Sequence, residues 1–244
     1  MSSTTRHATS LRACGSIRRN ATLAPDKQEW ALADLSTLTA ILAALVAWAS
    51  LALQFGLLVS HPDMAEAGIV AVFWRFLGYF TILTNTAVAV VATAMAVRPH
   101  TALASPRARL ATAVAIALVG LVYSLALRAV WNPTGWQAVA DHALHDVTPP
   151  VFLLAWALSS HGELAWQDAL HAILPPFAYC LYAFVRGAAD GWYAYWFLNP
   201  EALGPAGLAV SIAVLLSAFL LVALSLIALD RWLARRDSTP SVSR

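Results

Sequence analysis

The chain predicts an all-α polytopic membrane protein with six transmembrane helices, and three observations support this fold class. Its 244 residues are 60% hydrophobic and only 11% charged, whereas a soluble domain carries roughly 25% charged residues. Six apolar runs are long enough to cross a bilayer, and short connections with Pro, Gly, Asn and Asp separate them. Basic residues gather on alternate connections, as they do in membrane proteins of fixed orientation.

The apolar runs are expected to be helices because lipid cannot satisfy an open sheet edge and no run alternates like a membrane barrel strand. No connection is long enough to form a separate soluble domain. We expect a transmembrane domain over residues 35–229, a disordered cytoplasmic tail over 1–34 and a second cytoplasmic tail over 230–244. The predicted helices are residues 35–60, 69–97, 110–130, 141–158, 168–185 and 205–229.

The basic residues predict the orientation of the chain. By helix parity, twelve of the 15 lie on the side of the two termini and three lie on the opposite side. The positive-inside rule therefore places both termini in the cytoplasm, in what we expect to be a bacterial plasma membrane. The three opposite residues are Arg75, Arg128 and Arg186, all near helix ends.

The first 25 residues are rich in Ser, Thr and Arg and lack the apolar core of a secretory signal. We predict a disordered tail here. The alternative is a mitochondrial transit peptide, which is also rich in Arg and Ser and poor in acidic residues. Cys14 in this tail and Cys180 in an apolar run are both expected to be reduced.

Polar side chains gather in three clusters, at residues 79–85, 141–146 and 186–199. Helix parity puts all three at the same face of the membrane, in the half away from the termini. Polar groups in lipid are costly, so their collection at one depth indicates a site.

One chemistry that the clusters allow is nucleophilic catalysis by a hydroxyl group. His145 could accept a proton from Thr81, and either Asp141 or His142 could hold the imidazole, because they lie four and three residues before it on a helix. Asn85 lies one helical turn after Thr81 and could donate a hydrogen bond to an oxyanion.

Other interpretations remain open for the same residues. A Thr in a membrane helix commonly bonds to its own backbone or packs on a neighbour. His and Asp at a helix mouth are often interfacial, and two His near an Asp are also typical of a metal site. No further Cys or His has useful spacing on this side except His61. We predict no metal and no cofactor.

Substrate contacts are expected from Arg128 and from Tyr79, Tyr123 and Tyr195. The Arg128 guanidinium could hold a carboxylate through two hydrogen bonds, or it could extend to the lipid headgroups. Arg75 and Arg186 are interpreted as anchors. The aromatic run at residues 192–197 fits an interfacial belt first and a pocket lid second. The double prolines at 149–150 and 175–176 should kink or break their helices.

The order of these motifs resembles the androgen-induced-gene family of integral membrane proteins, which includes the androgen-dependent TFPI-regulating protein. The bacterial six-helix branch, sometimes called Pr-six-Pr proteins, is the nearer likeness, and the resemblance covers residues 73–200. The matching stretches, in the family's order, are Tyr79-Phe80-Thr81-Ile82-Leu83-Thr84-Asn85, Leu121-Val122-Tyr123 through Leu127-Arg128, Leu144-His145 with Pro149, Arg186-Gly187, and Tyr193-Ala194-Tyr195-Trp196-Phe197.

The resemblance implies an intramembrane hydrolase that cleaves fatty acid esters of hydroxy fatty acids with a Thr and a His. Thr81 and His145 match these two residues, and Thr84 fits a variable position. The chain departs from the family at Ala194 and Trp196, where Pro is frequent. It also departs at Asp141, where the animal members have Asn.

The sequence therefore predicts a lipid-ester hydrolase, whose partners are membrane lipids or fatty acid esters and not nucleic acid. The first alternative is acyl transfer between lipids at the same Thr and His. The second is a non-catalytic lipid-binding or scaffold protein. A proton-coupled transporter fits less well, because such a protein needs ionisable groups across the whole membrane depth.

Overall fold

The computed structural model describes the backbone of residues 27–237 and the side chains of residues 34–236. Over this range every regular element is a helix, which confirms the all-α fold class. Helix α1 (Lys27–Val59) begins inside the segment that the sequence assigns to the N-terminal tail. Helix α9 (Pro200–Asp237) likewise extends beyond residue 229, into the predicted C-terminal tail. The rest of both tails, with Cys14, lies outside the described residues.

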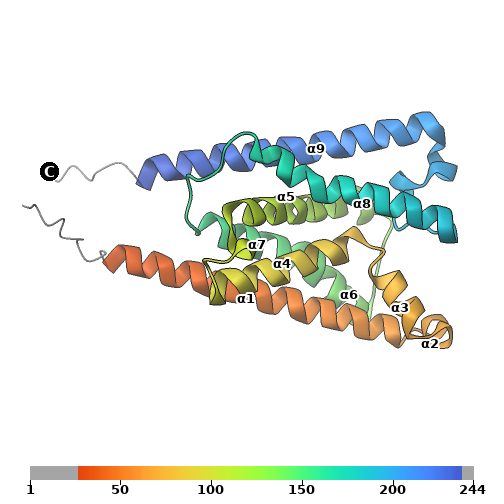
Figure 1. Cartoon of the computed structure of the whole chain (residues 1–244). Coiled ribbons are helices and arrows are strands. Elements are labelled where there is room, and N and C mark those ends of the chain that lie inside the picture. Colours follow the sequence, from red (N-terminus) through yellow and green to blue (C-terminus); the bar gives the residue numbers. More distant parts are fainter. Residues whose placement is uncertain (1–26, 238–244) are drawn as a thin grey trace, which may run out of the picture.

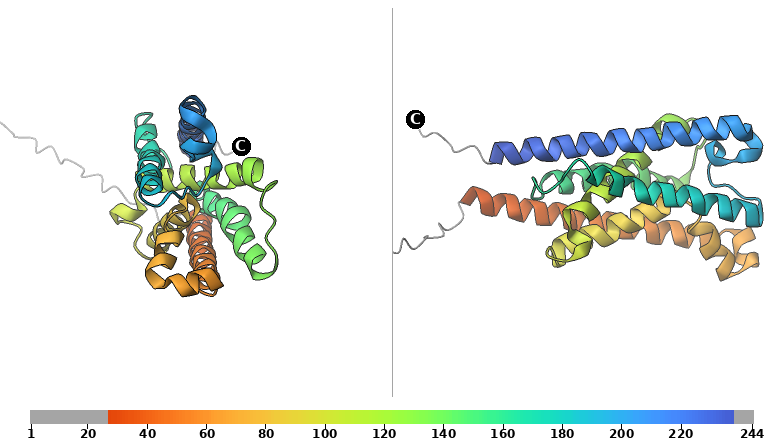
Figure 2. Two further views of the ribbon diagram at one scale, coloured as in Figure 1. Left: turned by 90° about the vertical axis from the view of Figure 1, so that its right-hand side faces the viewer. Right: turned by 45° about the horizontal axis from the view of Figure 1, so that its top comes forward.

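The long helices run side by side along one direction, with α1 and α9 on opposite sides of the bundle (Figures 1 and 2). Helix α5 lies between them and packs on α4, α7, α8 and α9, while α1 packs mainly on α4 and α7. The remaining elements are α2 (Pro62–Ala67), α3 (Ile69–Phe76), α4 (Phe80–Val97), η1 (Ala102–Ala104), α5 (Pro106–Val122), η2 (Tyr123–Leu127), α6 (Gly135–His142), η3 (Ala143–Val147), α7 (Thr148–Ala157), α8 (Asp168–Asp190) and η4 (Trp196–Leu198).

Five stretches of the described helices are long and apolar enough to cross a membrane. This number makes the chain a polytopic membrane protein, although six crossings were expected. The expected fourth span, residues 141–158, falls in a succession of α6, η3 and α7, which have 8, 5 and 10 residues. None of these pieces alone reaches the length of a crossing, but they follow one another without a gap over residues 135–157. The start of α1 and the end of α9 lie at the same end of the bundle (Figure 1), as an even number of crossings requires. The five stretches are Asp34–Val59, Phe80–Val97, Pro106–Leu127, Asp168–Asp190 and Pro200–Arg236.

The expected helix over residues 69–97 is broken in the structure. Helix α3 ends at Phe76, and α4 begins at Phe80 after Tyr79, whose backbone is extended. Between them, Gly78 lies so close to the side chains of Arg186 and Trp192 that a Cβ atom at this position would overlap both. Close packing from α8 and its following loop therefore coincides with the break. As a result, Thr81 lies in the first turn of α4.

Two π-helical segments, η2 and η3, interrupt the helices that face α4. The hydroxyl of Thr148, the first residue of α7, donates to the carbonyl of Ala143 in η3 at 2.8 Å. Pro149 and Pro150 follow directly and have no backbone N–H, so the carbonyl groups of His145 and Asp146 lose their usual helical donors. The expected irregularity at this double proline is thus present. By contrast, α8 continues through Pro175 and Pro176 without an end.

Small residues allow the helices around the site to approach closely. Ala43 and Ala47 of α1 are fully buried against Ala89 and Ala92 of α4 in one apolar cluster. On α5, a Cβ atom at Gly120 would lie 3.3 Å from the carbonyl oxygen of His145. Because the hydrophobic effect contributes little to helix association in lipid, close packing at small residues is what stabilises these contacts.

Candidate functional site

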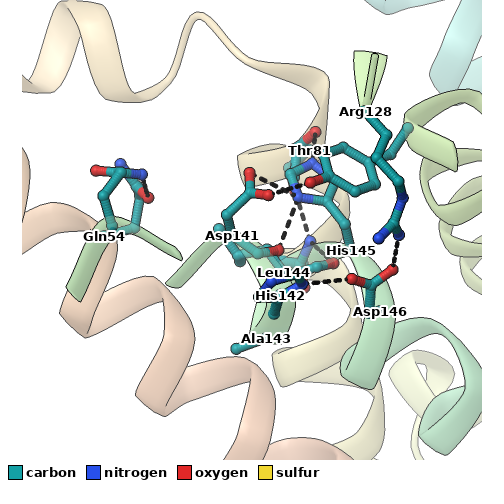
Figure 3. A network of polar contacts seen from close by, with 12 residues as sticks. Gln54, Thr81, Arg128, Asp141, His142, Ala143, Leu144, His145 and Asp146 are labelled. Atoms are coloured by element: carbon teal, nitrogen blue, oxygen red, sulfur yellow. Dashed lines mark hydrogen bonds and ion pairs between the residues drawn. The ribbon is translucent and has the colours of Figure 1, made fainter. Parts of the chain in front are cut away.

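Thr81 and His145, predicted as a pair, lie in contact. Thr81 Oγ1 in the first turn of α4 is 3.3 Å from Nε2 of His145 in the π-helical segment η3. Both side chains are largely buried, with 8% of Thr81 and 11% of the His145 side chain exposed. Figure 3 shows the imidazole between Thr81 and the end of α6. The pair therefore has the reach that proton transfer requires.

Asp141 holds the Nδ1 edge of the His145 ring, and Tyr123 packs on its face. Nδ1 of His145 lies 2.9 Å from the Asp141 carbonyl oxygen and 3.3 Å from Oδ1 of its carboxylate. Both atoms are acceptors, so the ring proton belongs on Nδ1, and Nε2 is left to accept from Thr81. The Tyr123 hydroxyl donates to the same carboxylate, and its ring stacks on the imidazole at 4.1 Å.

Tyr195 adds a contact that the sequence did not predict. Its hydroxyl oxygen lies 3.3 Å from Thr81 Oγ1 and accepts a hydrogen bond from the Thr81 backbone N–H at 3.2 Å. The Tyr195 proton is therefore free to point at Thr81 or at a reacting oxygen beside it. Burial raises the pKa of the Tyr195 hydroxyl, which keeps it a donor at neutral pH. Substrate binding was expected of Tyr195, and no signal in the sequence pairs it with Thr81.

A small apolar cavity of about 40 Å³ lies beside Thr81. Thr81 and Tyr195 line it, together with apolar side chains of α5, α8 and α9. A second cavity of about 310 Å³ lies between α4, α5 and α8, and Thr84 is on its wall. Phe80 and Tyr179 line both cavities, so these rings form their shared wall. The polar pair thus faces hydrocarbon-like surroundings.

Asn85 does not take the role expected from its spacing. It is fully buried, and its amide nitrogen donates to the carbonyl oxygens of Thr81 at 2.9 Å and Leu144 at 3.4 Å. These bonds use its donors, so they are not available to an oxyanion. Asn85 instead joins α4 to η3, because it binds the backbone of Thr81 and of Leu144, the residue before His145.

His142 and Arg128 also differ from expectation, because both are paired with Asp146. Nδ1 of His142 lies 2.7 Å from Asp146 Oδ2, on the exposed side of the helix and away from the His145 ring. Arg128 donates to the other oxygen of the same carboxylate and lies over the ring of Tyr123 (Figure 3). Of the two residues predicted to hold the imidazole, Asp141 contacts His145 and His142 does not, and the Arg128 charge already has a protein partner.

The aromatic run after α8 covers this end of α4 rather than forming only an interfacial belt. Tyr79, expected to bind substrate, packs edge-on against Trp192 at 5.3 Å, while Tyr195 stacks on Phe197 at 5.1 Å. Trp196 points outward and is 56% exposed. The run therefore combines the two interpretations, with Tyr195 and Phe197 on the cavity wall and Trp196 at the surface.

Arg186, interpreted as an anchor from the sequence, is almost completely buried. Only 3% of it is exposed, and its guanidinium lies between the rings of Trp74 at 4.4 Å and Trp192 at 4.8 Å. Asp190, one turn later on α8, lies 3.6 Å from its Nε atom. The spacing of Arg186 and Asp190 was the available sequence signal for this internal role.

The fold and the site together define the class: an all-α polytopic membrane protein that holds a buried hydroxyl–imidazole pair beside an apolar cavity. Comparisons with models of protein families, with curated proteins and with solved structures find no match. A function for this chain therefore rests on the geometry of the described residues.

Proposed function

We propose that this protein is an intramembrane lipid-ester hydrolase in which Thr81 is the nucleophile and His145 the general base. The observation that carries the proposal is the 3.3 Å contact between Thr81 Oγ1 and His145 Nε2, beside a cavity with apolar walls. A Thr that merely packed in lipid would bond to its own backbone, as Thr86 does at 2.8 Å to the carbonyl of Ile82.

In the first half of the reaction, Thr81 Oγ1 attacks the ester carbonyl carbon and its proton moves to His145 Nε2. The carbonyl oxygen becomes negatively charged and receives the Tyr195 hydroxyl proton as a hydrogen bond. When the intermediate collapses, the bond to the alcohol oxygen breaks and His145 returns the proton to that oxygen. The products are a free alcohol and an acyl ester on Thr81.

In the second half, His145 Nε2 removes a proton from a water molecule that attacks the acyl carbonyl. Collapse of this intermediate restores the Thr81 hydroxyl and releases a fatty acid. Asp141 and Tyr123 keep the imidazole oriented in both halves, because they hold its Nδ1–H and its ring plane.

The surroundings of the pair favour an apolar acyl group as the part of the substrate nearest to Thr81. The cavity beside it is lined by Leu118, Val119 and Phe219, among other apolar side chains. The resemblance to the androgen-induced-gene family points to fatty acid esters of hydroxy fatty acids as the substrate class. The distribution of basic residues supports a site in the outer half of a bacterial plasma membrane.

The test is ester turnover by the purified protein in lipid nanodiscs. Thr81→Ala and His145→Ala should each lower kcat to the background, and the double variant should be little worse than either, because residues that act as one unit are not additive. Thr84→Ala is the matched control, since Thr84 lies on the same helix but lines the other cavity. Equal loss in Thr84→Ala and Thr81→Ala would contradict the assignment of the nucleophile.

Product analysis in the same assay separates the alternatives. A hydrolase releases free fatty acid, whereas an acyltransferase at the same Thr81 would form a new ester with an added long-chain alcohol. A non-catalytic lipid-binding protein would show no turnover that depends on Thr81 or His145. We expect free fatty acid as the main product.

A further inference from the structure

A polar pocket, separate from the two cavities near Thr81, lies at the other end of the bundle, about 20 Å from Thr81 along α4. Its volume is about 670 Å³, and it lies between the start of α1, the α4–α5 connection and the segment after α7. None of the residues of the Thr81 site lines it, so an inference from it is independent of the proposed hydrolase. Its polar wall includes Ser36, His100, Ser105, Arg109, Ser160 and Glu163.

Arg109 is the feature of this pocket that needs an explanation. Only 8% of it is exposed, and its Nε atom has no hydrogen-bond partner. Its two terminal nitrogens reach only the hydroxyl of Ser160, at 3.5 and 3.4 Å. Within the described part of the chain no carboxylate lies within ion-pair distance of Arg109, and Glu163 and Asp230 act on its charge only from farther away. A buried guanidinium without a directly bound anion is costly, which indicates that an anion from outside completes its hydrogen bonds.

The start of α5 provides further donors on the same wall. Ser105 is the N-cap of this 17-residue helix, and its Oγ accepts the backbone N–H of Ala108 at 3.3 Å. Its own hydroxyl proton therefore remains available to the pocket. The helix N-terminus carries a partial positive charge that favours anions and adds to the Arg109 charge.

We propose that this pocket binds a phosphate group, either in the headgroup of an anionic phospholipid or as free phosphate. A guanidinium offers a planar fork that matches two phosphate oxygens, and the Ser105 hydroxyl can donate to a third. The pocket lies where the apolar part of α4 ends, at Met95 and Ala96, and hence where headgroups meet the protein.

The experiment uses the full-length protein in dodecyl maltoside micelles, which contain no phosphate. Thermal unfolding and native mass spectrometry are recorded after addition of phosphatidylglycerol, of inorganic phosphate, or of chloride at matched ionic strength. A bound molecule and a rise in Tm with phosphatidylglycerol alone assign a lipid headgroup. The same response to inorganic phosphate assigns free phosphate. A response to neither, or an equal response to chloride, overturns the proposal.

Variants decide whether the response comes from this pocket. Arg109→Gln should weaken binding by about tenfold or more, because a charge-assisted contact is lost. Arg98→Gln is the matched control, since Arg98 is exposed at the end of α4 and does not line the pocket. Equal loss in the two variants would indicate general surface charge and would overturn the proposal.

A second pair of variants leaves Arg109 in place, in case its replacement prevents folding. Ala102 is exposed and lines the pocket, so Ala102→Trp should occupy part of the pocket volume and weaken binding. Leu103→Trp is its control, because Leu103 is 53% exposed and does not line the pocket. Unchanged binding in Ala102→Trp would likewise overturn the assignment.

Discussion

The candidate site is a chain of hydrogen bonds in which each proton has one consistent place. Tyr195 donates toward Thr81, Thr81 donates to Nε2 of His145, and Nδ1 of His145 donates to Asp141. Tyr123 donates to Oδ2 of the Asp141 carboxylate, whose Oδ1 is the oxygen that faces His145. These residues come from four separate stretches of the chain, so only the tertiary fold aligns them.

A variant of Tyr195 tests whether its hydroxyl stabilises the oxyanion of the proposed reaction. Tyr195→Phe keeps the stacked ring on Phe197 but removes the only donor proton near Thr81 Oγ1 among the described side chains other than His145. We expect kcat for ester turnover to fall by about 100-fold with little change in KM, because the bond forms mainly in the transition state. Steady-state kinetics measure both constants.

Tyr193→Phe is the matched control for this variant. Tyr193 belongs to the same aromatic run, but its ring packs against Gly187 on α8 rather than against Thr81. Its kcat should be that of the wild type. If Tyr195→Phe raised KM and left kcat intact, Tyr195 would bind substrate, as the sequence alone predicted.

The sequence predicted the contact between Thr81 and His145 but not all of the neighbours of this pair. Helical spacing placed Asp141 within reach of His145, and that contact is present. The same spacing equally allowed His142 and Asn85, and it cannot tell which side chain is already satisfied elsewhere. Asn85 is occupied by two carbonyl groups and His142 by Asp146, and both facts depend on three-dimensional contacts.

At the scale of elements, irregular helices position the site. The break before α4 puts Thr81 in a first helical turn, and the π-helical segment η3 carries His145. Hydropathy alone predicted one uninterrupted run over residues 69–97, because the apolar character continues through the break. The double proline at 149–150 did signal an irregular fourth helix. The pair at 175–176 carries the same signal, yet α8 continues through it.

Gly78 in the break before α4 gives a prediction about stability. Gly78→Ala should lower the free energy of unfolding by about 1–3 kcal/mol, because its Cβ would overlap Arg186 and Trp192 in a packed region. Gly56→Ala in α1 is the control, since nothing lies within 4 Å of a Cβ there. That change should be neutral or stabilising. Thermal unfolding in micelles compares the two, and equal stability would contradict close packing at the break.

At the scale of the whole molecule, the two polar regions lie at opposite ends of the helix bundle. The Thr81 site lies toward α2 and α3, and the Arg109 pocket lies toward the ends of α1 and α9 that lead to the termini (Figure 1). The bundle was predictable because long apolar runs have few other solutions in lipid. The neighbours of each helix were not, since packing depends on small-residue faces such as Ala43 and Ala47.

The orientation of the bundle can be tested by labelling single cysteines from outside intact cells. In a Cys14→Ser, Cys180→Ser background, Ser3→Cys and Ser243→Cys should react with an impermeant maleimide only after the membrane is opened. Glu66→Cys, exposed on α2 at the other end, should react in intact cells. Labelling of either terminus from outside would reverse the orientation and place the Thr81 site toward the cytoplasm.

The proposed covalent role of Thr81 can be tested by reaction with a fluorophosphonate probe, followed by mass spectrometry of the labelled peptide. Thr81 should carry the adduct in the wild-type protein, because the imidazole 3.3 Å away activates its hydroxyl. The adduct should be absent in His145→Ala and retained on Thr81 in Thr84→Ala. An adduct on any other residue, or ester turnover that persists without reaction at Thr81, would contradict the proposed nucleophile.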